Sequence, residues 1–176
     1  MPTKGQNLWL PILAAALLLP LSALAQSGEN PNCTNATLEG DYAFRITGQV
    51  LPPGGAPIQR EGVAMTHFNG AGTLTQVDFV MANGVAVSGP KDPLSGFHTG
   101  ETGWYKVNPD CTGTAEIQFP TPPGASSGAV IDLMMVLSNH GRTIHTIVSR
   151  LLPPGSTTPV PASIHSDAEK LGDPEQ

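Results

Sequence analysis

Three ionisable residues that could do acid–base chemistry occur at alternate positions with apolar residues in strand-like segments. Glu101 lies between Phe97 and Tyr105, and His67 and His145 follow the same alternation in their own segments. Because alternate residues of a strand share a face, an apolar face turned inward would carry these side chains with it. An inward Glu101 would need a partner or would keep its proton, since burying a lone carboxylate is costly. A Glu–His pair inside the protein could then do general acid–base work on an apolar substrate.

The competing interpretation is structural. The three residues would then lie near an open end of the fold, or the strands would be offset by one residue, which exposes all of them. Asp132 is ambiguous in the same way, because it alternates with Met134 and Val136 while Leu133 competes for the inward side. If the apolar faces do point inward, the side chains predicted to line an interior pocket are Tyr42, Phe44, Met65, Phe79, Tyr105 and Met134.

Other chemistries have weaker support in the sequence. A metal site would have to be drawn from His67, His98, His140 and His145, whose spacing is not that of a compact ligand set. The chain has no Gly-x-Ser-x-Gly elbow of the kind that positions a hydrolase nucleophile. We therefore expect neither a metal nor another cofactor, and the sequence contains no catalytic signature.

The first 25 residues are typical of an export signal. Lys4 supplies a positive charge, residues 8–21 form an apolar run, and Ala23-Leu24-Ala25 offers the small-x-small pattern that a signal peptidase accepts before Gln26. The run is too short to span a bilayer comfortably, and no charged flank follows it. The chain is therefore expected to be secreted or periplasmic, with no membrane insertion after cleavage.

Charge and composition narrow the classes of partner. The formal net charge is −6, and the eight basic residues are scattered, which argues against a nucleic-acid partner and against docking on anionic lipid. The 20 glycines and 18 prolines favour many turns over long helices.

Short alternating segments separated by turn sequences predict seven or eight strands and no long helix. Hairpin turns such as Asn69-Gly70 join most of them, which favours an all-β, antiparallel up-and-down barrel; a β-sandwich is the alternative. The expected organisation is a signal peptide (1–25), an N-terminal tether (26–36), a barrel domain (37–152) and a polar C-terminal tail (153–176). One helical turn is expected in that tail, at Ser166–Leu171. The expected strands are 37–50, 59–68, 73–81, 85–87, 96–107, 114–119, 129–137 and 143–152.

The two cysteines, Cys33 and Cys111, both follow the predicted cleavage point. In an oxidising compartment they would form one disulfide. The alternative is a pair of free thiols with a metal or redox role, although no Cys-x-x-Cys pairing supports it.

Three segments together resemble a group of exported bacterial proteins of unassigned function. They are the stretch from Cys33 to Tyr42 (CTNATLEGDY), the stretch from Thr66 to Thr75 (THFNGAGTLT), and the stretch from Gly103 to Thr114 (GWYKVNPDCTGT), where Trp104 stands at a position that more often holds Thr. The resemblance covers roughly residues 33–152. It implies a small β-barrel, similar in outline to lipocalins or the allene oxide cyclase type, with the two cysteines paired. It implies no activity and no catalytic residues.

These observations predict a secreted β-barrel that binds a small apolar ligand or a surface partner without catalysis. A barrel of about eight strands has room inside for one small ligand or for side chains alone. One alternative is an isomerase- or cyclase-type enzyme that uses Glu101 with His67 or His145 inside the barrel. The other is a structural envelope or matrix component whose barrel is filled.

Overall fold

The structure is a computed structural model that describes Met1 and residues 32–172. Apart from Met1, the predicted export signal lies outside the described residues, as does most of the predicted tether. The described chain consists of strands, loops and two short 3-10 turns, η1 (Asn35–Leu38) and η2 (Asn139–Gly141), without an α-helix. None of its helical segments is long and apolar enough to cross a membrane.

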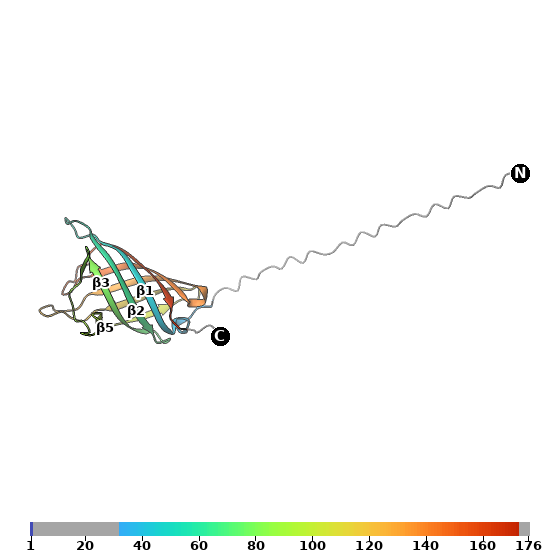
Figure 1. The fold of residues 1–176 in the computed structure, drawn as a ribbon, viewed down its shortest axis with the longest axis horizontal. Coiled ribbons are helices and arrows are strands. Elements are labelled where there is room, and N and C mark those ends of the chain that lie inside the picture. The colour runs from blue at the N-terminus through green and yellow to red at the C-terminus, as the bar shows by residue number, and fades with distance from the viewer. Residues whose placement is uncertain (2–31, 173–176) are drawn as a thin grey trace.

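Eight antiparallel strands close into a barrel (Figure 1), which confirms the predicted fold class. Strands that follow one another around the barrel pair as hairpins, and the last strand pairs with the first to complete the ring. Closure is the expected solution for a chain of short strands, because it pairs the outer strands that a sandwich would leave as edges. The barrel strands are β1 (Gly40–Val50), β2 (Ile58–Phe68), β3 (Thr73–Ala82), β5 (His98–Val107), β6 (Thr112–Gln118), β7 (Val130–Ser138), β8 (Thr143–Leu152) and β9 (Ala162–Lys170), with a two-residue strand β4 (Val85–Ala86) attached to β3.

The strand that closes the ring, β9, lies in the segment predicted to be a polar tail, so that prediction is wrong. The helical turn expected at Ser166–Leu171 is also wrong, because β9 runs through it and pairs with both β1 and β8. Ile164, Ser166 and Ala168 are buried on its inner face. The strand was not predicted because its inward residues are mostly small or polar and give little apolar alternation. Its stability comes from two backbone ladders rather than from large apolar side chains.

One end of the barrel, where the described chain begins and ends, is packed solid and is called the closed end here (Figure 1). The Phe68 ring packs edge-to-face between Tyr42 and Tyr105, with ring centroids 5.4 and 4.9 Å apart. Leu38 of η1 is completely buried in the same cluster. The Tyr42 hydroxyl donates a 2.6 Å hydrogen bond to the Gly141 carbonyl, so this buried polar group is satisfied.

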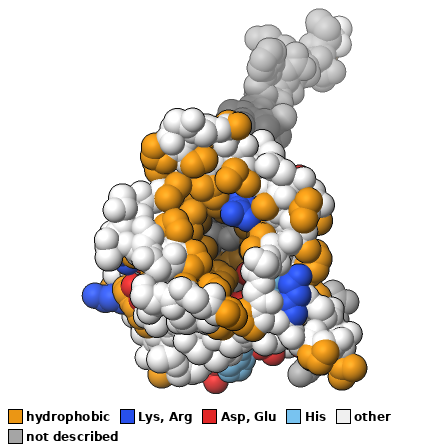
Figure 2. All heavy atoms as spheres, turned by 90° about the vertical axis from the view of Figure 1, so that its left-hand side faces the viewer, with side chains coloured by type: hydrophobic (Ala, Val, Ile, Leu, Met, Phe, Trp, Pro, Cys, Tyr) orange, Lys and Arg blue, Asp and Glu red, His pale blue; other side chains and the backbone are white. Residues whose placement is uncertain are grey.

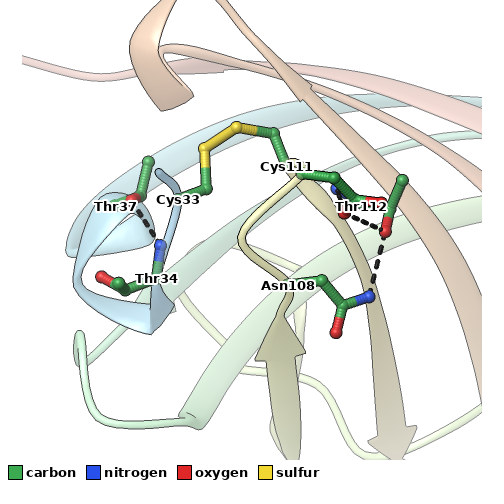
Figure 3. The surroundings of a disulfide bond; sticks show 7 residues. Cys33, Thr34, Thr37, Asn108, Cys111 and Thr112 are labelled. Carbon is green, nitrogen blue, oxygen red and sulfur yellow. Dashed lines mark hydrogen bonds between the residues drawn. A yellow bond between two sulfur atoms is a disulfide. The ribbon is translucent and has the colours of Figure 1, made fainter. Parts of the chain in front are cut away.

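A disulfide joins Cys33 to Cys111 at the closed end (Figure 3), which confirms the predicted pairing. Cys33 lies two residues before η1, and Cys111 lies in the turn between β5 and β6. The Cys33 amide also donates to the Pro109 carbonyl at 3.2 Å. Nearby, the Thr34 amide donates to the Thr37 hydroxyl at 3.0 Å. These contacts fasten the segment before β1 across the packed end of the barrel.

The inward face of β6, and that of β5 from Glu101 onward, are those predicted, with Tyr105, Val107, Ala115 and Ile117 buried. The faces predicted for β2, β3 and β8 are wrong by one residue. On β2, for example, Ala64, Thr66 and Phe68 are buried while Met65 is 47% exposed. The cause is that along part of their length these strands carry small or polar residues inside, such as Ala64, Thr66 and Thr146, and large apolar ones outside, which reverses the usual pattern. Of the candidates expected inside, Met65, His67, Phe79 and His145 point outward. Their neighbours on the same strand faces do so as well: Val63, Val77, Met81 and Ile147.

Gly103, on the inner side of β5, shows how closely two strands approach. A Cβ atom built at Gly103 would lie 2.0 Å from the Glu116 carbonyl oxygen of β6. We expect Gly103→Ala to lower the free energy of unfolding by about 1–3 kcal/mol, because the β5–β6 ladder would have to shift. Urea unfolding measures this, with the exposed neighbour Thr102→Ala as a control expected to stay within about 0.5 kcal/mol. Equal effects of the two substitutions would contradict the close approach.

Candidate functional site

A cavity of about 490 Å³ occupies the half of the barrel opposite the disulfide, called the open end here. Side chains from all eight barrel strands line it, and most of them are apolar, including Phe44, Ile117 and Leu133. Figure 2 looks into this end and shows a deep opening walled mainly by hydrophobic side chains. The volume lies within the range of about 300–1,000 Å³ that is usual for small-molecule sites.

Prolines frame the mouth of the cavity. Four loops connect the strands at this end, residues 51–57, 83–97, 119–129 and 153–161, and they contain twelve of the eighteen prolines of the chain. Because proline fixes φ, these loops lose less conformational freedom on binding than flexible loops would. The mouth is therefore largely preformed. The prolines that line the cavity are Pro52, Pro90, Pro120, Pro122, Pro153 and Pro154.

Away from the loops and strand ends at the mouth, most of the polar side chains of the cavity form two hydrogen-bonded groups. Thr146 of β8 and Ser166 of β9 hydrogen-bond to each other at 2.6 Å. The larger group lies on the adjacent strands β2, β3 and β5, where the Thr66 hydroxyl donates to Gln76 Oε1 at 2.8 Å. Its ionisable members, described next, are Asp78, His98 and Glu101, all buried.

A β-bulge brings His98 and Glu101 to the same side of β5 although they are three residues apart. Gln76 pairs with Glu101 and Asp78 pairs with His98, so two steps along β3 face three steps along β5. Gly100 absorbs the extra residue with a φ of +85°, a value that favours glycine. Strict alternation placed His98 on the opposite side from Glu101, and sequence reasoning missed both His98 and Asp78 as cavity residues. A glycine inside a strand, here Gly100, was the available signal.

Glu101 is the unsatisfied group of the cavity. Its side chain is 1% exposed, and neither carboxyl oxygen has a hydrogen-bond partner among the described residues. Burial, with a smaller contribution from the neighbouring Asp78 carboxyl, raises the pKa of Glu101 to about 8. At neutral pH the group is therefore mainly a neutral acid, with one donor and one acceptor oxygen that are both buried and unpaired.

The Asp78–His98 pair is fully engaged instead. His98 Nε2 lies 3.1 Å from the Val87 carbonyl, which can only accept, so this nitrogen carries a hydrogen. His98 Nδ1 lies 2.8 Å from Asp78 Oδ1, and one proton shared in that bond satisfies both groups. Burial raises the pKa of Asp78, and the bond to His98 partly opposes that shift. With both ring nitrogens occupied, His98 ties the loop at residues 83–97 to the barrel wall rather than acting as a free base.

Removing the His98 ring should therefore loosen the mouth. We expect His98→Phe to lower the free energy of unfolding by about 1–3 kcal/mol, since it leaves a buried carboxyl without its partner. The loop at residues 83–97 should become more sensitive to limited proteolysis. The matched control is His67→Phe, because His67 makes a similar 2.8 Å bond to Asp41 on the outer face, where exposed pairs contribute little. A cost as large for the control would contradict this assignment.

The structure does not bring the three candidate catalytic residues together. His67 and His145 lie on the outer face, more than half exposed, and bond to Asp41 and Asp167 at 2.8 and 2.7 Å. The expected interior pair of Glu101 with either histidine is therefore not formed, because the faces of β2 and β8 are offset by one residue. Asp132 bonds to Arg150 at a half-exposed position. A catalytic role for Glu101 itself stays a prediction.

The six side chains predicted to line a pocket divide into three sets. Phe44 lines the cavity. Tyr42 and Tyr105 are buried in the packed closed end instead. Met65, Phe79 and Met134 lie on the outer face of the barrel, where Phe79 packs against Phe97.

Within residues 32–172, no three His, Cys, Asp or Glu side chains come together in a way that could hold a metal ion. Comparison of the chain with models of protein families and with curated proteins finds no match. Fold and cavity thus define the chain as a small closed β-barrel with a preformed, mainly apolar interior site and one unsatisfied carboxyl.

Proposed function

We propose that this protein binds a small, largely apolar molecule in the open half of its barrel. The observation that carries the proposal is the 490 Å³ cavity, mainly apolar, in which the buried Glu101 carboxyl has no partner among the described side chains. Convergence of a few polar groups in an apolar, preformed cavity is typical of small-molecule sites. Such a cavity also favours binding over the alternative of a structural envelope component, which would have a filled barrel.

The proposal places this binding outside the cytoplasm, in the periplasm or beyond the cell. The Cys33–Cys111 disulfide supports that compartment, because disulfides persist in oxidising environments. The signal-like sequence of residues 1–25 and the resemblance to exported bacterial proteins point the same way. The net charge of −6 supports a small-molecule partner rather than a nucleic acid. The short apolar run at residues 8–21 supports the proposal that the chain does not insert into a membrane after cleavage.

The test is binding of an uncharged apolar fluorophore, N-phenyl-1-naphthylamine, to the folded protein. We expect saturable binding of one probe per chain. Ala115→Phe should weaken it at least about tenfold, because Ala115 is buried and lines the cavity, so the new ring occupies the site. Ile131→Trp, nearer the mouth, gives a second filled cavity should the first variant fold poorly. Gln118→Phe adds the same ring at an exposed position of β6 and should leave binding unchanged.

Binding inside the barrel would be refuted if Ala115→Phe and Ile131→Trp both left the affinity for the fluorophore unchanged. It would also be refuted if Gln118→Phe weakened fluorophore binding as much as they do.

Catalysis at Glu101 is the second candidate function. It is favoured by one observation, a carboxyl that burial brings to a pKa of about 8 inside an apolar cavity, where proton transfer near neutral pH is possible. A ligand extracted from the native protein would be returned to wild type and to Glu101→Gln and analysed by mass spectrometry. Conversion by the wild type alone would establish catalysis, whereas an unchanged ligand from both would establish binding without turnover.

A further inference from the structure

We propose that the ligand of this cavity is a hydrophobic amine, whose ammonium group binds the Glu101 carboxyl while its hydrocarbon part fills the apolar remainder of the barrel. The inference rests on the proposed binding function and names the chemical class that the site would select. The carrying observation is that both Glu101 oxygens are buried in the cavity wall without a partner in the described chain.

The hydrogen-bonding groups next to Glu101 include acceptor oxygens of Asp78 and Gln76, while the Gln76 amide nitrogen is a donor. Asp78 Oδ1 already receives the proton shared with His98, and Gln76 Oε1 receives the Thr66 hydroxyl. Once ionised, Glu101 adds two further acceptor oxygens. An ammonium group has three donors and no acceptor, so it matches this set better than an alcohol, which has one donor. Bonds between charged groups are also roughly twice as strong as neutral ones.

The charges that face the cavity point to a cationic ligand. On β3, Asp78 is close enough to repel a second negative charge, which disfavours an anionic ligand. On β5, His98 is already hydrogen-bonded to Asp78. Arg60 is the one Lys or Arg among the described lining residues, and it lies near the start of β2. Thr66, which belongs to the polar group around Glu101, lies farther along the same strand, about 20 Å away at roughly 3.3 Å per residue. His165 of β9 is exposed to solvent.

Among the described residues, the cavity-lining side chains of β1, β6, β7 and β8 have no titratable group. In the described part of the chain, the one Lys or Arg side chain that lines the cavity is therefore the half-buried Arg60, and Arg60 is not among the groups that shift the pKa of Glu101. A ligand ammonium would supply the missing charge. Its attraction to the ionised Glu101 carboxylate would offset both its own desolvation and the cost of ionising that carboxyl inside the barrel.

Binding must then displace one proton near neutral pH. The free protein holds Glu101 mainly as the neutral acid, because burial raises its pKa to about 8. When an ammonium ion enters, the carboxyl proton passes to the buffer and an ion pair remains, so charge and atoms balance. The affinity for an amine should consequently rise with pH, by up to about tenfold per pH unit, until the pH reaches that pKa. A neutral alcohol of the same length should show no such rise.

The experiment compares decan-1-amine, decan-1-ol and decanoate as displacers of the fluorophore, with calorimetry at pH 7 in two buffers of different ionisation enthalpy. We expect the amine to bind at least about tenfold more tightly than the alcohol and to release about one proton. Glu101→Gln should abolish proton release and weaken amine binding at least about tenfold, while alcohol binding stays within about twofold. Glu101→Met provides a second variant, and cooperative unfolding of each variant verifies that it is folded.

The outcomes separate the two proposals. Equal or tighter binding of the alcohol, or amine binding that Glu101→Gln leaves unchanged, would overturn the amine inference and leave apolar binding intact. Preference for decanoate would overturn it in the same way. Absence of saturable binding for all three compounds and for the fluorophore would overturn both proposals.

Discussion

The free energy of unfolding is expected to decrease as the pH rises from 5 to 8, and Glu101 is the main cause. Its pKa is about 8 in the folded protein and near 4.5 in the unfolded chain, so between these values the folded state binds more protons. Stability is therefore fully present below pH 4.5 and is lost as the pH rises through 8. At about 1.4 kcal/mol per pKa unit, the loss reaches up to about 5 kcal/mol. The raised pKa of Asp78 acts in the same direction.

Glu101→Met should remove most of this pH dependence and make the protein more stable than the wild type at pH 8. The methionine side chain fits an apolar wall without leaving an unpaired charge. Chemical denaturation across the pH range measures the effect. The control is Glu61→Met, because Glu61 is exposed on the outer face of β2 and should change stability by no more than about 0.5 kcal/mol. A wild-type stability that is flat from pH 5 to pH 8 would contradict the unpaired, buried state of Glu101.

Removing the disulfide should give the second largest effect. Cys33 and Cys111 close a loop with a sequence separation of 78 residues, and the chain-entropy model assigns such a loop about 4 kcal/mol of stability. We expect the double variant Cys33→Ser, Cys111→Ser to lose free energy of unfolding on that scale, measured by urea denaturation. Probe affinity at pH 7 should stay within about twofold wherever the variant remains folded, because the bond lies at the closed end.

Two results would contradict this account of the disulfide. A loss below about 1 kcal/mol would mean that the bond hardly restricts the unfolded chain. A large loss of probe affinity in the folded double variant would mean that the closed end and the cavity are not independent.

The sequence was sufficient for the fold class and for seven of the eight barrel strands, but not for the closing strand β9 or for the inner surface. Regular hairpin turns and alternation predicted the strands, and on β5 and β6 the apolar residues do face inward, as Tyr105 and Ile117 demonstrate. On β2 and β8 the rule failed because a hollow barrel does not need large side chains inside. There Thr66 and Thr146 face the cavity, while Met65 and Ile147 face outward.

The candidate site was predicted only in part, and for local reasons. The inward orientation of Glu101 followed from simple alternation along β5. His98 was missed because the bulge at Gly100 breaks that alternation. Asp78 was missed because its apolar neighbours Val77 and Phe79 were expected to face inward, yet they lie on the outer face. Closure by β9 was missed because its inner residues include Ser166 and Ala168, which carry little hydrophobic signal.

The most direct test of the central claim is a heteronuclear NMR titration of the folded protein with N-phenyl-1-naphthylamine. Interior binding predicts saturable shifts of cavity residues such as Ile46, Ile117 and Leu133, with one binding constant shared by all of them. Outer-face residues such as Met134 and Val136, which are 51% and 53% exposed, should keep their positions. Saturable shifts confined to that outer face, or no saturable shift at all, would contradict a ligand site inside the barrel.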